Sequence, residues 1–310
     1  MRKILRAIVF LLLITGGIMI VFYFLGINYK DEIYMFYRDK IVKVQDNIKL
    51  DKNKYYKNKD YSYVQNTDDF VAKDKKHLLN IFYTIVNSGN REFTFYCDKK
   101  YTNCTKDVVE LVEDKNIISN INNFVHPYNS FEKINTSYDK YGEIKLEIDK
   151  VYTDTDINKI NDKVKDIMSK EITDKMSDKQ KITKIHNYII NNGKYATDTI
   201  RAKNKDKTYN KANDILLDGY GLCSSYSDAM AIFLYELGID NYKIASESHI
   251  WNLVNVDKKW LHLDLTWDDP ITQSGKDKLE TMFLLIDNKK LKELKVGKHE
   301  YNKDVYKEAA

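Results

Sequence analysis

The longest apolar stretch of the chain is residues 7–27, which carry no charged side chain and follow Arg2, Lys3 and Arg6. As a helix rising about 1.5 Å per residue, such a stretch spans roughly 30 Å, the thickness of a bilayer hydrocarbon core. No small-x-small cleavage site follows it, which disfavours a removed signal peptide. Because the cations precede it, we expect a single-pass signal-anchor in the plasma membrane, with residues 1–6 cytoplasmic and the remainder extracytoplasmic. A buried core helix is the alternative.

Residues 28–66 alternate charged and aromatic side chains without the apolar periodicity of a helix or a strand. Such a stretch is typical of a spacer, so we expect a stalk between the membrane and the folded part. Residues 67–175 mix helical spacing with strand-like alternation, which predicts a small α+β accessory domain without a chemical motif. Its expected elements are helical segments at 68–87, 107–125 and 156–172, a strand at 92–97 and two strands within 133–152.

A second domain, residues 176–310, begins with a helix start, because Ser177 and Gln180 have the spacing of a capping box. Apolar residues then recur on one helical face until Asn192 and Gly193 end the pattern. Further expected elements are a loop at 197–211 and helical segments at 212–218 and 226–237.

Two strand patterns, residues 249–256 and 260–267, are separated by a turn. If residues 257–258 form a two-residue hairpin loop, His249 and Asp264 lie on the same face as diagonal neighbours. Side chains in that relation lie roughly 7 Å apart at their Cβ atoms, within reach of a hydrogen bond. A register change of one residue would place the two on opposite faces.

The chain has three cysteines, which is few for an exported protein. Cys97 and Cys104 are close enough in sequence to form one disulfide in an oxidising compartment, and this pairing stays open. Cys223 is left as a thiol. It follows the tight Gly219 to Gly221 turn at the start of a helix, where free backbone N–H groups and the helix dipole favour a thiolate and an oxyanion. Inward packing of an inert thiol is the alternative.

Among the histidines, His262 is the alternative base, because it lies two residues from Asp264. Four others have no comparable setting: His77, His126, His186 and His299. Histidine and cysteine never approach zinc-ligand spacing, so we expect neither a metal nor a cofactor. A formal charge of +4 with 31% charged residues does not suggest a nucleic-acid partner.

Three segments in order resemble the core of the transglutaminase-like superfamily in its bacterial branch: Gly219 to Tyr226, His249 to Asn252 and Asp264 to Pro270. The resemblance covers about residues 177–270, and more loosely the tail to His299. It implies an α+β, papain-like core in which the cysteine opens a helix packed on an antiparallel sheet. By that resemblance, Cys223, His249 and Asp264 form the catalytic triad. The family's additional oxyanion donor is not identifiable, and Tyr209 and Tyr220 are the candidates.

The resemblance and the spacing together predict thiol acyl transfer on peptide or glutamine amides through a thioester. We favour hydrolysis by a protease or amidase, and the alternative is transglutaminase crosslinking of glutamine to an amine. A non-catalytic cell-surface module for binding or scaffolding is the rival of another class. The expected substrate is an extracytoplasmic protein or a cell-wall peptide.

Overall fold

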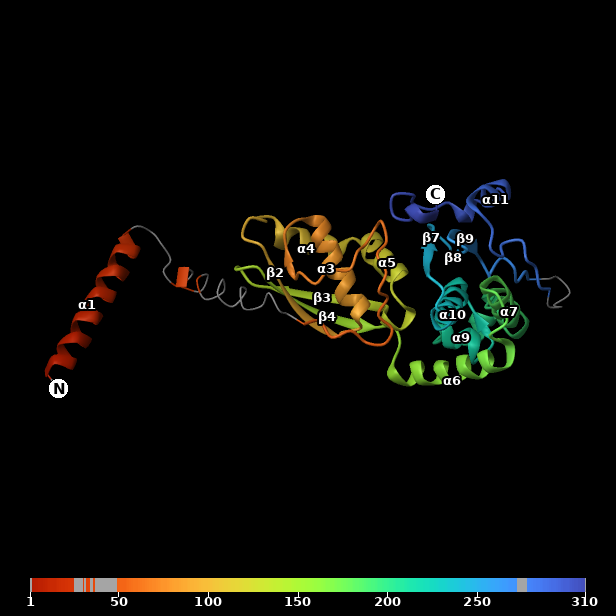
Figure 1. Cartoon of the computed structure of the whole chain (residues 1–310), viewed down its shortest axis with the longest axis horizontal. Coiled ribbons are helices and arrows are strands. Elements are labelled where there is room, and N and C mark those ends of the chain that lie inside the picture. The colour runs from red at the N-terminus through yellow and green to blue at the C-terminus, as the bar shows by residue number, and fades with distance from the viewer. Residues whose placement is uncertain are drawn as a thin grey trace. The chain divides into compact units, whose positions relative to one another are not determined.

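The computed structural model describes residues 2–24, 30, 32, 33, 36, 49–271 and 278–309. Backbone contacts divide the chain into two units, of which the first contains helix α1 (Arg2–Phe24) and the second comprises residues 50–138 and 142–310 (Figure 1). Among the described helices, none has both the length and the apolar character that a membrane crossing requires. Residues 25–27 of the expected anchor lie outside the described part of the chain.

The second unit opens with a four-stranded sheet in the order β1-β2-β4-β3, in which only β1 and β2 run parallel. The expected strand at 92–97 is confirmed, and the expected helix over 107–125 is two helices because Asp114 caps the second. A disulfide joins Cys97 at the end of β2 to Cys104 at the start of α4, with an S–S distance of 1.98 Å. The elements are β1 (Val71–Ala72), α3 (Lys75–Ser88), β2 (Glu92–Cys97), α4 (Cys104–Glu113), α5 (Lys115–Phe124), η1 (Pro127–Asn129), β3 (Phe131–Tyr138) and β4 (Glu143–Lys150).

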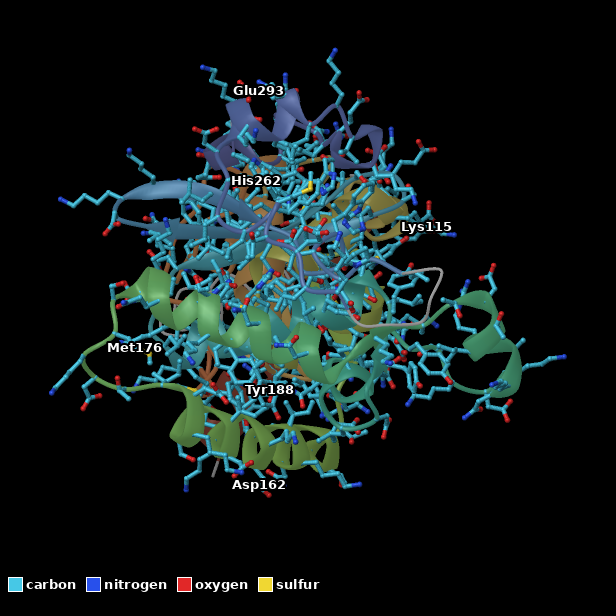
Figure 2. All side chains as sticks on the ribbon, turned by 90° about the vertical axis from the view of Figure 1, so that its right-hand side faces the viewer. Lys115, Asp162, Met176, Tyr188, His262 and Glu293 are labelled. Carbon is cyan, nitrogen blue, oxygen red and sulfur yellow. A yellow bond between two sulfur atoms is a disulfide. The ribbon has the colours of Figure 1, made fainter. Side chains whose placement is uncertain are left out.

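Two long helices follow, α6 (Asp154–Glu171) and α7 (Asp178–Asn192). The predicted capping box at Ser177 is confirmed: its backbone N–H donates to Gln180 Oε1 at 2.9 Å and its Oγ accepts from the Gln180 N–H at 3.3 Å. Met176 lies in the connection between these helices (Figure 2). The expected loop at 197–211 contains a short helix. Smaller elements are β5 (Lys194–Tyr195), α8 (Asp198–Lys203), α9 (Ala212–Leu216) and β6 (Tyr220–Gly221).

Helix α10 (Cys223–Glu236) packs on an antiparallel sheet in the order β7-β8-β9. The predicted two-residue loop is confirmed, because Val256 pairs with Lys259 across the hairpin. Asp257 and Lys258 have φ angles of 52° and 64°, as a type I′ turn requires, so the turn sets the register. The remaining elements are β7 (Asn241–Ala245), β8 (Ile250–Val256), β9 (Lys259–Leu263), α11 (Asn288–Glu293), η2 (Gly297–His299) and η3 (Lys307–Ala309).

Helices pack beside sheets whose longer strands pair antiparallel, so the predicted α+β class is confirmed. The core around α10 is aliphatic and aromatic, and it joins α6, α7, α9 and the β7-β8-β9 sheet through residues such as Ile160, Ile185, Ile215, Phe233 and Val254. The expected boundary at residues 175 and 176 lies between α6 and α7, within the second unit. The domain boundaries stay predictions.

The expectation of a stalk is wrong for residues 50–66, which pack into the folded unit. Tyr55, Tyr61 and Val64 are buried, and the Tyr55 ring stacks on His126 with 4.8 Å between centroids. The Tyr61 hydroxyl donates to the Asn241 carbonyl at 3.2 Å. Irregular backbone can bury isolated aromatic side chains without any apolar period, so the absence of a period did not imply exposure. Most of residues 28–48 lie outside the described part of the chain.

Candidate active site

Cys223 is the first residue of α10 and is half-buried. At this position the first N–H groups of a helix have no partner within the helix, and they carry the positive end of its dipole. A sulfur anion or an oxyanion placed here is therefore stabilised. The predicted position of Cys223 at a helix start is confirmed.

The two glycines before Cys223 serve different needs. Gly219 has a φ of 75°, in the left-handed region that favours glycine. A Cβ atom on Gly221 would lie 2.6 Å from Ser225 Cβ, so only glycine lets the turn approach α10 this closely. The Ser225 hydroxyl donates to the Tyr209 carbonyl at 2.6 Å and thereby ties residues 209 and 225 together. These constraints fix the backbone that presents the thiol.

His249 and Asp264 lie at the open end of the β8-β9 hairpin, where the ladder ends at Asn252 and Leu263. His249 Nε2–H donates to Asp264 Oδ2 at 2.6 Å, and both side chains are buried. The predicted contact between them is confirmed. Asp264 Oδ1 accepts hydrogen bonds from the backbone N–H groups of Thr266 and Trp267, at 2.9 and 3.3 Å.

The same histidine interacts with the cysteine. Burial alone would lower the pKa of His249, but its hydrogen bonds with Asp264 and with Cys223 outweigh burial and raise that pKa to about 9. Because Nε2 is bonded to Asp264, Nδ1 is the ring nitrogen left for the sulfur. Asp264 stays ionised, since the hydrogen bonds from its histidine partners hold its pKa below the usual range against the effect of burial. The three predicted residues thus form a continuous array.

The order of these residues along the chain agrees with a family match. A model of the transglutaminase-like superfamily matches residues 166–265, which include Cys223, His249 and Asp264. The chain carries a transglutaminase-like domain. A search of curated proteins found no match to the chain.

Among solved structures, the chain is similar to a TGase, with 15% identity over 44% of this chain and 44% of that one and a TM-score of 0.32. It is also similar to a candidate cysteine protease from Cytophaga hutchinsonii, with 16% identity over 49% and 66% and a TM-score of 0.27. A candidate protease from Parabacteroides distasonis shares 12% over 48% and 40%, with a TM-score of 0.24. The chain spans less than two thirds of the length of each.

The site contains a second histidine that sequence reasoning set aside. His299, in η2, donates from Nε2 to the same Asp264 Oδ2 at 2.7 Å and is buried. No periodicity marks it, because the segment around it is irregular. The only signal was the loose extension of the resemblance to this residue.

These side chains also form a set that could hold a metal ion. The ligand atoms of His249, Asp264 and His299 lie within 4.8 Å of one another. Asp264 Oδ2, however, already accepts two hydrogen bonds, with N···O distances of 2.6 and 2.7 Å that are typical of charge-assisted hydrogen bonds. We therefore assign the set as a hydrogen-bonded array rather than a metal centre.

His262, the alternative base, has a different role in the transglutaminase-like domain. It lies in β9 (Figure 2) and is buried, and its Nδ1 accepts from Trp251 Nε1–H at 3.0 Å. Burial, together with the charge of His299, lowers the pKa of His262 to about 4. A neutral histidine bonded to a tryptophan packs the sheet, and this setting favours His249 as the base.

A tyrosine that sequence reasoning missed lies on the strand that pairs with the turn before the thiol. Tyr195 pairs with Gly221 between the parallel strands β5 and β6. Burial and the charge of Cys223 raise the pKa of Tyr195. The earlier candidates differ from it: Tyr209 holds α10 through its backbone carbonyl, and Tyr220 is exposed.

The aspartates that follow Asp264 hold the site to the helices. Asp268 Oδ2 bonds His186 Nε2 on α7 at 3.1 Å, and both side chains are fully buried. The Tyr226 hydroxyl, on α10, donates to Asp269 Oδ2. These contacts give Asp268 and Asp269, in the third segment of the family resemblance, a structural role.

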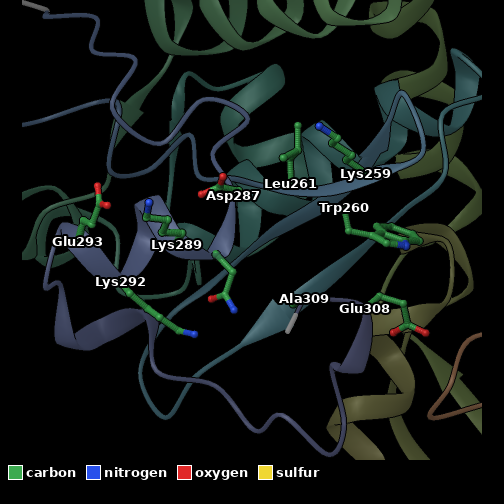
Figure 3. A pocket seen from close by; sticks show the side chains of 10 residues that line it. Lys259, Trp260, Leu261, Asp287, Lys289, Lys292, Glu293, Glu308 and Ala309 are labelled. Carbon is green, nitrogen blue, oxygen red and sulfur yellow. The ribbon is translucent and has the colours of Figure 1, made fainter.

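A cavity of about 810 Å³ lies between β9, α11 and the C-terminal end (Figure 3). Trp260 and Leu261 line it on one side, and Lys289 and Lys292 on the other. None of the predicted catalytic residues lines this cavity. It therefore gives no basis for assigning the substrate of the thiol site.

Proposed function

We propose that the transglutaminase-like domain is a thiol acyl-transfer enzyme in which Cys223 is the nucleophile, His249 its acid and base, and Asp264 the orienting group. One observation supports this most directly: His249 bonds a buried carboxylate through Nε2, which leaves Nδ1 for the Cys223 sulfur, a group that also raises the pKa of His249. A nucleophile bonded to a base that a third group orients is the arrangement of covalent acyl transfer.

In the first step, the Cys223 thiolate attacks an amide carbonyl carbon, and the oxyanion forms near the start of α10. His249, as the imidazolium, gives its Nδ1 proton to the departing amine or ammonia. The C–N bond breaks and a thioester remains on the sulfur. Asp264 keeps the other ring proton at Nε2 throughout, so the imidazole presents the correct nitrogen.

In the second step, His249 takes a proton from water, the hydroxide oxygen attacks the thioester, and the acid leaves as the Cys223 thiolate re-forms. If an amine attacks instead, a new amide forms. We favour water, because Cys223 is half-buried rather than enclosed and the thioester is open to solvent. Transglutaminase crosslinking is the alternative outcome of the same site.

An extracytoplasmic location is part of this proposal. The Cys97–Cys104 disulfide supports an oxidising compartment. The cations before residues 7–27 support an anchor with its N-terminus in the cytoplasm. On this basis we propose an extracytoplasmic protein or a cell-wall peptide as the substrate class.

The reactivity of the thiol tests the enzyme proposal. We expect iodoacetamide to label Cys223 of the full chain faster at pH 7 than it labels the same thiol in denaturant, as mapped by mass spectrometry. In Cys223→Ala, formation of a thioester with peptide substrates is lost, while the melting temperature is retained. If native Cys223 labels no faster than the denatured thiol, the protein is a binding or scaffolding module instead.

The fate of the thioester is tested separately. The full chain is incubated with glutamine-bearing peptides and a labelled primary amine, and the products are weighed by mass spectrometry. Hydrolysis predicts a mass gain of one unit or peptide cleavage without label. Incorporation of the amine that depends on Cys223 would establish crosslinking and exclude our preference for water.

A further inference from the structure

We propose that His299 is a positioning residue of the thiol site, which holds the Asp264 carboxylate so that it orients His249. The inference rests on the proposed function of Cys223. It concerns a residue beyond the segment matched by the family model, residues 166–265.

The carboxylate is held at both oxygens. Oδ1 accepts from the backbone N–H groups of Thr266 and Trp267 at 2.9 and 3.3 Å. Oδ2 accepts from His249 at 2.6 Å and from His299 at 2.7 Å. Without His299, the bond that fixes Oδ2 would be the one to His249, the residue that Asp264 has to orient. His299 is thus the independent anchor of that oxygen.

The His299 ring is itself held firmly. It stacks on Phe283 with 5.0 Å between centroids and 10° between planes, and its centroid lies 4.8 Å from that of Trp251 and 5.3 Å from that of Trp267. The Ser246 hydroxyl donates to the Lys298 carbonyl at 2.6 Å and fixes the backbone beside it. A phenylalanine would fill such an aromatic cage without a polar atom, so packing alone does not call for an imidazole.

The second effect of His299 is electrostatic. Its N–H group points positive charge at Asp264 and thereby offsets part of the attraction that Asp264 exerts on the His249 imidazolium. Removal of this donor therefore raises the pKa of His249, whether His299 is neutral or charged. Other titratable groups around the two histidines include Cys223, His262 and Asp287, and the replacement leaves these three side chains in place.

The test compares two replacements of His299 in the full chain. H299F keeps the aromatic shape and removes the donor, whereas H299Q places an amide N–H near the position of Nε2. The rate of Cys223 alkylation by iodoacetamide is measured against pH, which requires no substrate. The upper inflection, which we expect at about pH 9 for the wild type, reports His249.

We expect the upper inflection of H299F to move up by about half to one pH unit, the effect of losing one hydrogen bond, and that of H299Q to stay in place. An unmoved inflection in H299F would show that His299 only packs, and would overturn the inference. If H299F does not fold, H299N replaces it, since the asparagine amide is too short to reach Asp264.

The two proposals fail in different ways. A wild-type thiol that alkylates no faster than the denatured one contradicts the proposed function itself. A reactive wild-type thiol with identical profiles in H299F and H299Q contradicts only the role of His299.

Discussion

Helix α10 contributes to two buried ionic clusters that use similar chemistry for different ends. The thiol site, at the first residue of the helix, consists of Cys223, His249, Asp264 and His299. The second, which we name the Asp228 cluster, consists of Asp228, Lys243 and Tyr152. In it, Lys243 Nζ donates to Asp228 Oδ1 and the Tyr152 hydroxyl donates to Oδ2 at 2.7 Å.

The difference between the two clusters is what each leaves accessible. In the Asp228 cluster a carboxylate, an ammonium and a hydroxyl satisfy one another, and all three side chains are buried. In the thiol site the charges are also bonded, but the array ends on a half-buried sulfur at a helix N-terminus. Burial and short hydrogen bonds alone therefore do not mark a catalytic site. An accessible nucleophile at the end of the array does.

Replacement of Asp264 gives the largest effect and breaks the thiol site. Asp264→Asn keeps the size of the side chain but removes its charge and favours the wrong imidazole tautomer. By analogy with orienting aspartates elsewhere, we expect a loss of roughly 10³- to 10⁴-fold in acyl-transfer rate. Thioester formation per folded molecule measures it. A loss below tenfold would mean that Asp264 does not orient His249.

The matched change in the Asp228 cluster should act on stability instead. Asp228→Asn leaves the buried Lys243 ammonium without its counter-charge, which costs about 3–5 kcal/mol of unfolding free energy. Denaturant unfolding measures it, and Cys223 alkylation in the folded fraction should be unchanged. The double variant with Lys243→Met should recover most of the stability. If it recovers nothing, the ion pair is not the source of the loss.

Much of the site could be predicted because local rules govern it. A two-residue loop after Val256 sets the register that puts His249 beside Asp264, and a tight glycine turn marks the start of α10. These features depend on a few neighbouring residues. The helix starting at Ser177 is another such case, since its capping box is complete within four residues.

The features that prediction missed have no local pattern. Tyr55 and Tyr61 are buried by partners far along the chain, such as His126 and Asn241. His299 joins the site from an irregular segment that tertiary contacts alone bring to Asp264. Periodicity reports only elements that bury one regular face, so isolated side chains on irregular backbone escape it.

A replacement of Tyr195 tests whether this residue belongs to the thiol site. If its hydroxyl stabilises the oxyanion, Tyr195→Phe should lower the acyl-transfer rate by about 10- to 100-fold and leave the alkylation rate of Cys223 nearly unchanged, because alkylation forms no oxyanion. Tyr220→Phe, an exposed neighbour across the β5-β6 pair, is the control and should change neither rate. Equal loss in both reactions would mean that Tyr195 acts on the thiol rather than on the oxyanion.

Lys57 is not a member of the Asp228 cluster but is affected by the charge of Lys243, and replacing it should have the smallest effect. It is buried, its Nζ donates to the Asn241 carbonyl, and burial, with the charge of Lys243, lowers its pKa from 10.5 to about 7. Between pH 7 and pH 10.5 the unfolded state binds more protons than the folded state, so this lysine makes the free energy of unfolding rise with pH over that window. Below pH 7 the cost of burying its charge lowers stability in full.

The effect of Lys57→Met on the free energy of unfolding should therefore change sign with pH. At pH 6 it removes a buried charge and should be neutral or stabilising by about 1 kcal/mol. At pH 9 the wild-type lysine is neutral and keeps its hydrogen bond, so the same change should destabilise by about 1 kcal/mol. Denaturant unfolding at both pH values measures the difference. A variant that destabilises equally at pH 6 and pH 9 would show that Lys57 stays charged in the fold. Lys57, which lies in the predicted stalk, would then be a buried cation whose charge is balanced by its surroundings, as Asp228 balances that of Lys243.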